Sequence, residues 1–216
     1  MHTISFQHIF WLLLLAPVST FAGHGFVTAF ANIEGLPDPG RTPDSAWYRL
    51  DAWQEEGRLT LARNPEAKVR LYLAFTREKL AEIEMMVKVK NTQAAEIAAD
   101  RYQLYLDQAR HLILSARETT TKEALADLMA NALLDQQYIL SVIYEEMPVA
   151  SRSVVSQVIT TAQERYQNIS RLLPLKKQKA LFFKEEEVRW SVRMVLTPTP
   201  TYATGEGEKF QKEEEP

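Results

Sequence analysis

Histidine, the side chain most often used as a general base near neutral pH, is scarce in the body of this chain. Three of the four histidines lie within the first 24 residues, and only His111 lies further on. A Ser–His–Asp triad, a multi-histidine zinc site or a di-metal bundle site needs better-placed histidines than this. His111 stands beside apolar positions of a helical pattern, so we interpret it as a residue at the boundary of the core.

Carboxylates occur in clusters, of which Glu78 with Glu82 and Glu145 with Glu146 are pairs and residues 185–187 are three glutamates in a row. Paired carboxylates perform acid–base chemistry when a cleft buries them and separates their pKa values. On helices with a basic residue four positions later, as Arg189 stands after Glu185, such carboxylates usually form a solvated face. We therefore expect these clusters to face water.

Three aspartates, Asp38, Asp44 and Asp51, flank a proline-rich entry segment. A calcium loop needs oxygen ligands at alternate positions and a glycine turn, and this spacing does not supply them. Turn and helix-capping roles suit Asp38 and Asp44 better.

Overall composition narrows the chemistry further. The chain has no cysteine, which excludes disulfides, thiolate nucleophiles and zinc held by cysteine. Its 25 basic and 28 acidic side chains give a net charge of −3, which leaves no basic excess for nucleic acid. We expect no catalytic residue, no cofactor, no metal and no enzymatic activity.

Glycine and proline are missing from long stretches of the body of the chain, and these stretches would have to form the elements that hold any functional site. No glycine occurs between Gly57 and Gly205, and no proline between Pro65 and Pro148. Such stretches, rich in good helix formers, favour α-helix. Four apolar stripes with steps of three and four residues agree with this and predict helix faces that pack on one another. They are Val69, Tyr72, Thr76, Leu80, Ile83 and Val87; Ala98, Tyr102, Tyr105, Ala109, Leu112 and Ala116; Leu125, Met129, Ala132, Gln136, Ile139 and Ile143; and Val155, Ile159, Ala162, Tyr166, Ile169 and Leu173.

Capping signals set the expected helix boundaries. Asn64 before Pro65 is a favoured helix start, and Asn91-Thr92 lies in a polar break where one helix can stop and the next can be capped. Thr120 with Glu123 has the spacing of a capping box. Short connections force consecutive helices antiparallel, so the sequence predicts an all-α, elongated antiparallel helical bundle of about five to six helices. We expect helices near 44–56, 65–90, 92–118, 121–147, 149–173 and 175–195.

The aromatic side chains mostly fall on or beside the apolar stripes. They could line a binding groove, but large rings at helical spacing more often fill a core, and we expect core packing. The residues concerned are Trp47, Trp53, Tyr72, Phe75, Tyr102, Tyr105, Tyr138 and Tyr144.

The first 33 residues contain no Lys, Arg, Asp or Glu. The apolar run 9–18 is too short to cross a bilayer, and small residues follow it, as a signal peptidase site requires. We expect residues 1–22 to be a signal peptide cut after Ala22, with a later site after Ala31. An uncleaved anchor is the alternative. Cleavage would make the protein exported, periplasmic or extracellular in a bacterium.

Residues 34–173 resemble the DUF5667 family of bacterial domains. The likeness rests on the turn Leu36-Pro37-Asp38-Pro39 and on the helix start Asn64-Pro65-Glu66. It also rests on the segment from Leu73 to Glu82, which is similar to the leucine- and glutamate-rich motif of the family. Gly40-Arg41-Thr42-Pro43 is an insertion relative to the family's first turn. The resemblance implies an extracytoplasmic helical domain and implies no activity.

The segment 174–196 is more apolar than a surface helix needs, and six basic residues interleave with it. It could fold back on the bundle, which we favour, or lie on a membrane surface or a partner. The tail 197–216, with its alternating prolines and its glutamates, is predicted to be disordered. If the segment 174–196 binds a partner, the residues we expect to take part are Phe182, Phe183, Arg189, Trp190 and Arg193.

Two functional hypotheses follow. The first is an exported, non-catalytic interaction or structural module of the cell envelope, which binds a protein partner or the envelope surface. The second is a periplasmic chaperone or stress-sensor-like clamp, which would hold clients on an exposed apolar face.

Overall fold

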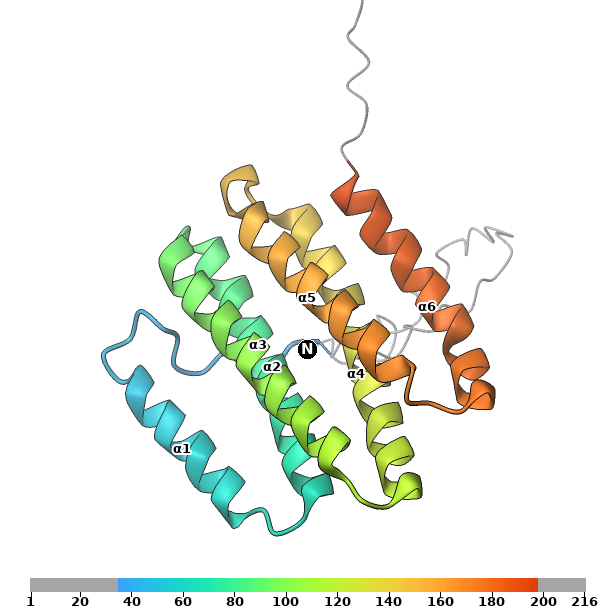
Figure 1. Cartoon of the computed structure of the whole chain (residues 1–216). Coiled ribbons are helices and arrows are strands. Elements are labelled where there is room, and N and C mark those ends of the chain that lie inside the picture. Colours follow the sequence, from blue (N-terminus) through green and yellow to red (C-terminus); the bar gives the residue numbers. More distant parts are fainter. Residues whose placement is uncertain (1–34, 198–216) are drawn as a thin grey trace, which may run out of the picture.

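The structure is a computed structural model that describes residues 35–197. The predicted signal peptide, residues 1–22, and residues 198–216 of the predicted tail lie outside the described residues. Between 35 and 197 the chain forms six α-helices, one short 3-10 helix and no strand, so the all-α prediction is confirmed (Figure 1). The helices are α1 (Tyr48–Leu61), α2 (Pro65–Lys88), α3 (Thr92–Ser115), α4 (Thr119–Glu146), α5 (Arg152–Ser170) and α6 (Leu175–Leu196), and the 3-10 helix η2 (Val149–Ser151) precedes α5.

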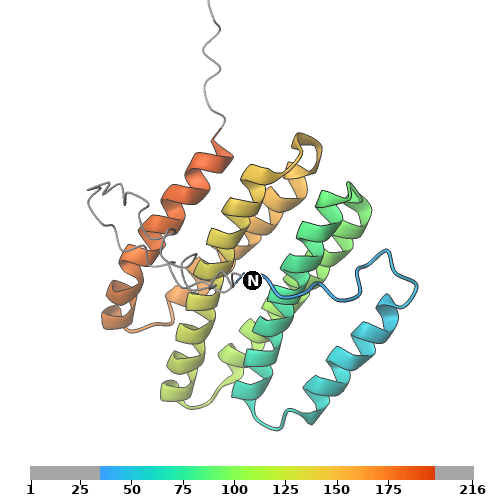
Figure 2. The same ribbon diagram turned by 180° about the vertical axis from the view of Figure 1, so that it is seen from behind.

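Two antiparallel hairpins form the centre of the bundle. The hairpin of α2 and α3 packs beside the hairpin of α4 and α5, and their apolar stripes meet in one core. Both views show α1 at one lateral edge of the molecule and α6 at the other (Figures 1 and 2). Fully buried core side chains include Phe75, Leu80, Tyr102, Leu106, Met129, Leu133 and Ile159.

Two of the predicted helix starts are confirmed. Pro65 is the first residue of α2, and the Asn64 side chain accepts a hydrogen bond from the backbone N–H of Ala67 at 2.6 Å. At the start of α3, Asn91 accepts one from the backbone N–H of Ala94 at 3.2 Å. These bonds satisfy N–H groups that have no partner inside the helix.

The predicted capping box at the start of α4 is wrong. The helix begins at Thr119, so Thr120 already lies inside its first turn and cannot act as the cap. Glu118 takes the cap position, and the Thr121 hydroxyl donates to its carboxylate at 2.8 Å.

Helix α1 also lies later in the chain than we expected. It spans 48–61 instead of 44–56, because Gly57 does not stop it. A glycine inside a helix costs about 1 kcal/mol relative to alanine, yet the turn that follows Gly57 is helical and contacts α2. Arg58 in that turn pairs with Glu78 at 3.7 Å and lies 5.0 Å from the ring centre of Phe75.

A chain of hydrogen bonds crosses the apolar core. The Tyr102 hydroxyl on α3 donates to the Gln136 side-chain oxygen on α4 at 2.9 Å. The Gln136 amide nitrogen donates to the Thr76 hydroxyl on α2 at 2.8 Å, and Thr76 donates to the carbonyl of Leu73 at 2.8 Å. All three polar side chains are therefore satisfied although they are buried.

Most of the aromatic predictions hold, but two fail. Tyr102 and Phe75 are fully buried, and Tyr105 is buried with its ring centre 5.9 Å from that of the half-buried Tyr72. Trp47 and Trp53, in contrast, are 65% and 71% exposed. They lie at the α1 edge of the molecule, where only one side of the chain faces the bundle. Within residues 35–197 no helix has the length and hydropathy that a membrane span requires.

Candidate functional site

The inner face of α6 is narrow and apolar. Leu181, Val188 and Val192 are its buried residues, and they join the common core mainly against α4. Ion pairs at the margin reinforce the contact, with Lys177 at 2.8 Å from Asp127. The helix therefore folds back on the bundle and does not project from it.

The outward face of α6 carries large apolar side chains that water reaches. Phe182 is 53% exposed, Phe183 80% and Trp190 66%. The two phenyl rings touch edge to face with their centres 5.7 Å apart. At 100° per residue these side chains fall on one side of the helix, together with Leu175 and Met194.

Basic residues share that outward face. Lys176 and Lys179 are exposed near the start of α6, and Arg189 and Arg193 near its end. Arg189 is held by its own helix, at 2.7 Å from Glu185 and 2.6 Å from Glu186, which confirms the predicted pair with Glu185. We call this set of exposed apolar and basic side chains the α6 ridge. All the residues predicted for partner binding belong to it, namely Phe182, Phe183, Arg189, Trp190 and Arg193.

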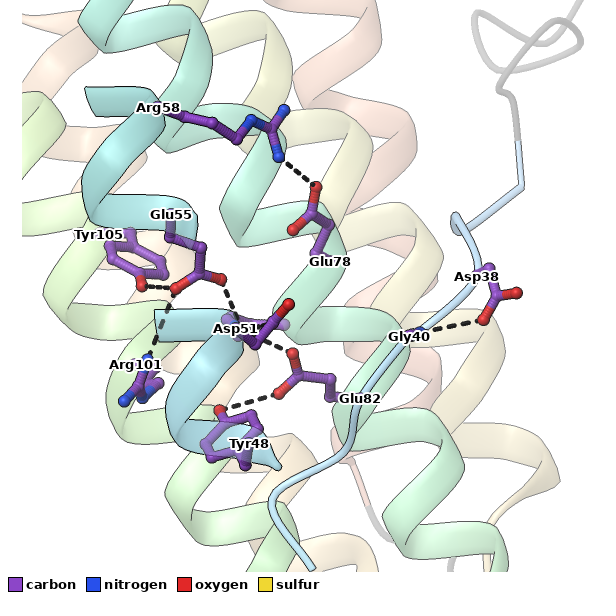
Figure 3. A network of polar contacts seen from close by, with 11 residues as sticks. Asp38, Gly40, Tyr48, Asp51, Glu55, Arg58, Glu78, Glu82, Arg101 and Tyr105 are labelled. Carbon is purple, nitrogen blue, oxygen red and sulfur yellow. Dashed lines mark hydrogen bonds and ion pairs between the residues drawn. The ribbon is translucent and has the colours of Figure 1, made fainter. Parts of the chain in front are cut away.

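The opposite edge holds a buried ionic cluster that the sequence did not reveal (Figure 3). The ammonium of Lys79, on α2, has no exposed surface and lies 2.8 Å from Glu55 on α1. It also lies 2.5 Å from Glu82, one turn further along α2, and 3.7 Å from Asp51. Both glutamates are buried as well, at 3% and 1% exposed.

Two tyrosines and an arginine complete the cluster. The Tyr48 hydroxyl donates to Glu82 at 3.0 Å, and the Tyr105 hydroxyl donates to Glu55. Arg101 on α3 lies 3.5 Å from Glu55 and 4.9 Å from the ring centre of Tyr48. The cluster thus ties α1 to both α2 and α3.

The protonation of the cluster follows from burial and from an excess of negative charge. Three carboxylates, on Asp51, Glu55 and Glu82, face the two cations of Lys79 and Arg101. Burial, opposed by the nearby Lys79, raises the pKa of Glu82 to about 7. Although burial alone would lower the pKa of Lys79, the glutamates raise it, so Lys79 stays charged. Burial likewise raises the pKa of the Tyr48 and Tyr105 hydroxyls.

The expectation that Glu82 faces water is therefore wrong. Glu82 and Lys79 have opposite charge, stand three residues apart, and lie on the same side of α2 as Phe75 and Met86. A charge pair on the apolar side of a helix was the signal that could have found them, since such residues are buried only when paired. Glu55 offered no comparable signal on α1.

The other predicted site residues occupy ordinary positions. Asp38 accepts from the backbone N–H of Gly40 at 2.9 Å, and Asp44 accepts from the Thr42 hydroxyl at 2.5 Å, so both have the turn roles we expected. His111 is exposed on α3. Among residues 35–197, no group of three His, Cys, Asp or Glu side chains has an arrangement that could hold a metal ion.

Comparison with known families gives one match. The model of the family described as "Domain of unknown function (DUF5667)" matches residues 40–180, well over half of the chain. The chain belongs to the DUF5667 family. The DUF5667 match covers all of α1 to α5 with the turns between them, but only the first six residues of α6, so Phe182, Phe183 and Trp190 lie beyond it. The searches among curated proteins and among solved structures gave no match.

Proposed function

We propose that this protein is an exported, non-catalytic interaction module of the cell envelope, and that it makes its contact through the α6 ridge. The observation that carries the proposal is the exposure of Phe182, Phe183 and Trp190 on one side of a helix that is already packed on its other side. Aromatic side chains and arginine are the types enriched where proteins bind.

Burial of this ridge against a partner would be favourable. Removing apolar surface from water stabilises a contact by about 25 cal/mol per Å², and each large aromatic side chain offers 150–250 Å² or so. The rings already touch one another, which reduces the side-chain freedom that binding would have to remove.

Export is supported by the N-terminal sequence. A short apolar run followed by small residues is typical of a cleaved signal peptide. The exported form should then begin at Gly23, or at Asn32 if the later site is used. N-terminal sequencing of the protein recovered from outside the cytoplasm tests this, and an intact Met1 in the membrane pellet would contradict it.

Photo-crosslinking in intact cells tests the interaction. A photoreactive residue placed at Phe183 should give specific crosslinked products, either with a protein or with lipid. The same residue placed at Trp53 is the matched control, because Trp53 is an exposed aromatic on the opposite edge. Equal crosslinking from both positions, or none from Phe183, would reject the ridge as the contact surface.

The same exposed ridge also suits the second hypothesis, a chaperone or clamp for unfolded clients. A chaperone should suppress the aggregation of unrelated unfolded proteins, and Phe183→Ser should weaken that effect. A dedicated envelope module should leave such aggregation unchanged.

A further inference from the structure

The α6 ridge differs in charge from the rest of the molecule. The whole chain has a net charge of −3, yet the four charged residues of α6 that are exposed as whole residues are basic: Lys176, Lys179, Arg189 and Arg193. Among the glutamates of α6, Glu186 has a side chain that is 43% exposed, and it pairs with Arg189. Arg189 is neutralised by Glu185 and Glu186, whereas Lys176, Lys179 and Arg193 form no ion pair with any residue between 35 and 197. The ridge therefore presents a local positive excess at both ends of the helix.

This distribution disfavours a second copy of the chain as the occupant. In a parallel pairing, each basic end of α6 would face the same basic end of its partner. In an antiparallel pairing, Lys176 and Lys179 would face Arg189 and Arg193. Like charges meet in either orientation, and such contacts oppose association.

The shape and residue types suit a lipid surface instead. Helix α6 has 22 residues, so its ridge is about 33 Å long, and it runs along a lateral edge of the bundle (Figures 1 and 2). Phenylalanine and tryptophan on one side of a helix enter the boundary between lipid headgroups and acyl chains. Lysine and arginine beside them keep their charges at the level of the phosphates while their alkyl parts stay apolar.

We propose that the α6 ridge docks on an anionic lipid surface, with Phe182, Phe183 and Trp190 entering the interface and Lys176, Lys179 and Arg193 contacting lipid phosphates. This inference rests on the proposed function, for which it names the partner. It requires no rearrangement of the bundle, because the buried residues Leu181, Val188 and Val192 lie on the other side of the helix.

The test uses the exported form of the protein recovered from cells and lipid vesicles in a co-sedimentation assay. The protein should bind vesicles that contain phosphatidylglycerol and should bind pure phosphatidylcholine vesicles far more weakly. Replacing Lys176, Lys179 and Arg193 by Gln should weaken binding by about 100-fold, since each basic residue near an anionic surface contributes about fivefold. Added salt should reduce binding by the wild type and have little effect on this variant.

Phe183→Ser and Trp190→Ser test the apolar part. Each should weaken binding at least tenfold, and Trp190 fluorescence should shift to the blue when vesicles are added to the Trp47→Phe/Trp53→Phe background. Trp53→Ser is the matched control and should bind as the wild type does. Circular dichroism confirms that each variant is folded.

The outcomes separate this inference from the proposed function. Failure to bind anionic vesicles, together with crosslinks from Phe183 to a protein, would overturn the lipid inference and leave the interaction module standing. Failure in both assays would overturn both. Equal binding to neutral and anionic vesicles would refute the role assigned to the basic residues.

Discussion

The two edge helices of the bundle are attached by opposite means. Helix α1 buries only Tyr48 and Glu55, and the buried ionic cluster around Lys79 holds it in place. Helix α6 buries only apolar residues, and its ion pairs lie at the margin, where water reaches them. Burial of apolar surface tolerates small shifts, whereas a buried ion pair stabilises only when every partner is in place. The attachment of α1 to the bundle should therefore depend on single charges and on pH, whereas the attachment of α6 should depend on neither.

The sharpest test of this contrast removes the central cation. Lys79→Met leaves Glu55 and Glu82 buried without their counter-charge and should destabilise the protein by about 3–5 kcal/mol. Urea unfolding measures the loss. At the α6 edge Lys177→Met is the matched control, and it should cost under about 1 kcal/mol, because the pair with Asp127 is partly exposed. Similar losses for the two variants would remove the contrast.

Shortening a buried side chain of α6 tests whether its apolar face holds the helix on the bundle. Leu181→Ala should destabilise the protein by about 2–3 kcal/mol, near the low end for buried leucines because the site lies at the edge of the core. Leu80→Ala in the centre of the bundle is the reference and should cost more, up to about 5 kcal/mol. If Leu181→Ala costs under about 0.5 kcal/mol in thermal or urea unfolding, α6 is not held by its apolar face.

Titration of Glu82 should make the α1 edge dependent on pH. Its pKa is raised from an ordinary value of 4.5 to about 7 in the folded protein. Between these values the folded state binds more protons than the unfolded state, so stability falls as the pH rises. The fall should be on the order of 3 kcal/mol.

The comparison with Glu82→Gln isolates this effect, because the amide cannot titrate. Unfolding curves of the two proteins, recorded from about pH 4.5 to about pH 8, should show the wild type losing stability relative to the variant. A difference that stays constant over this window would show that folding does not raise the pKa of Glu82.

The smallest effect on stability is expected for the α6 ridge. Phe183→Ser changes a side chain that is 80% exposed, and it should alter the free energy of unfolding by less than about 0.5 kcal/mol. A larger loss in urea unfolding would mean that the ridge contributes to the fold, and its exposure could then not be attributed to binding.

Periodicity was enough to predict the four central helices, and side-chain caps were enough for two of their starts. Apolar positions repeat every three or four residues there, and the side chains of Asn64 and Asn91 each accept a hydrogen bond from a backbone N–H in the first turn of the helix that follows. Phe182, Phe183 and Trp190, which were predicted to bind a partner, are exposed on α6, and their role in binding stays a prediction.

The ionic cluster could not be predicted in the same way. Lys79 and Glu82 lie on the apolar side of α2, which indicates burial but does not identify their partners on α1 and α3. Glu55 looks like a solvated residue until α1 is placed against α2 and α3, and α1 itself has too weak an apolar pattern to show how it docks. The predicted core packing of Trp47 and Trp53 was wrong for a related reason, because the burial of these side chains depends on what covers α1. Local patterns predict which face of a strongly amphipathic helix is buried, but they do not predict which neighbours a weakly amphipathic helix will find.

The hydrogen bonds through Gln136 have a consequence for alignment. Stripes of similar apolar side chains would let one helix slide along another by a full turn, about 5.4 Å, with only a modest loss of packing. Such a slip would separate Gln136 from both Tyr102 and Thr76 and leave three polar groups unsatisfied in an apolar interior. Gln136 thus fixes how α2, α3 and α4 are aligned along their axes. The apolar residues of the interior alone would accept more than one such alignment.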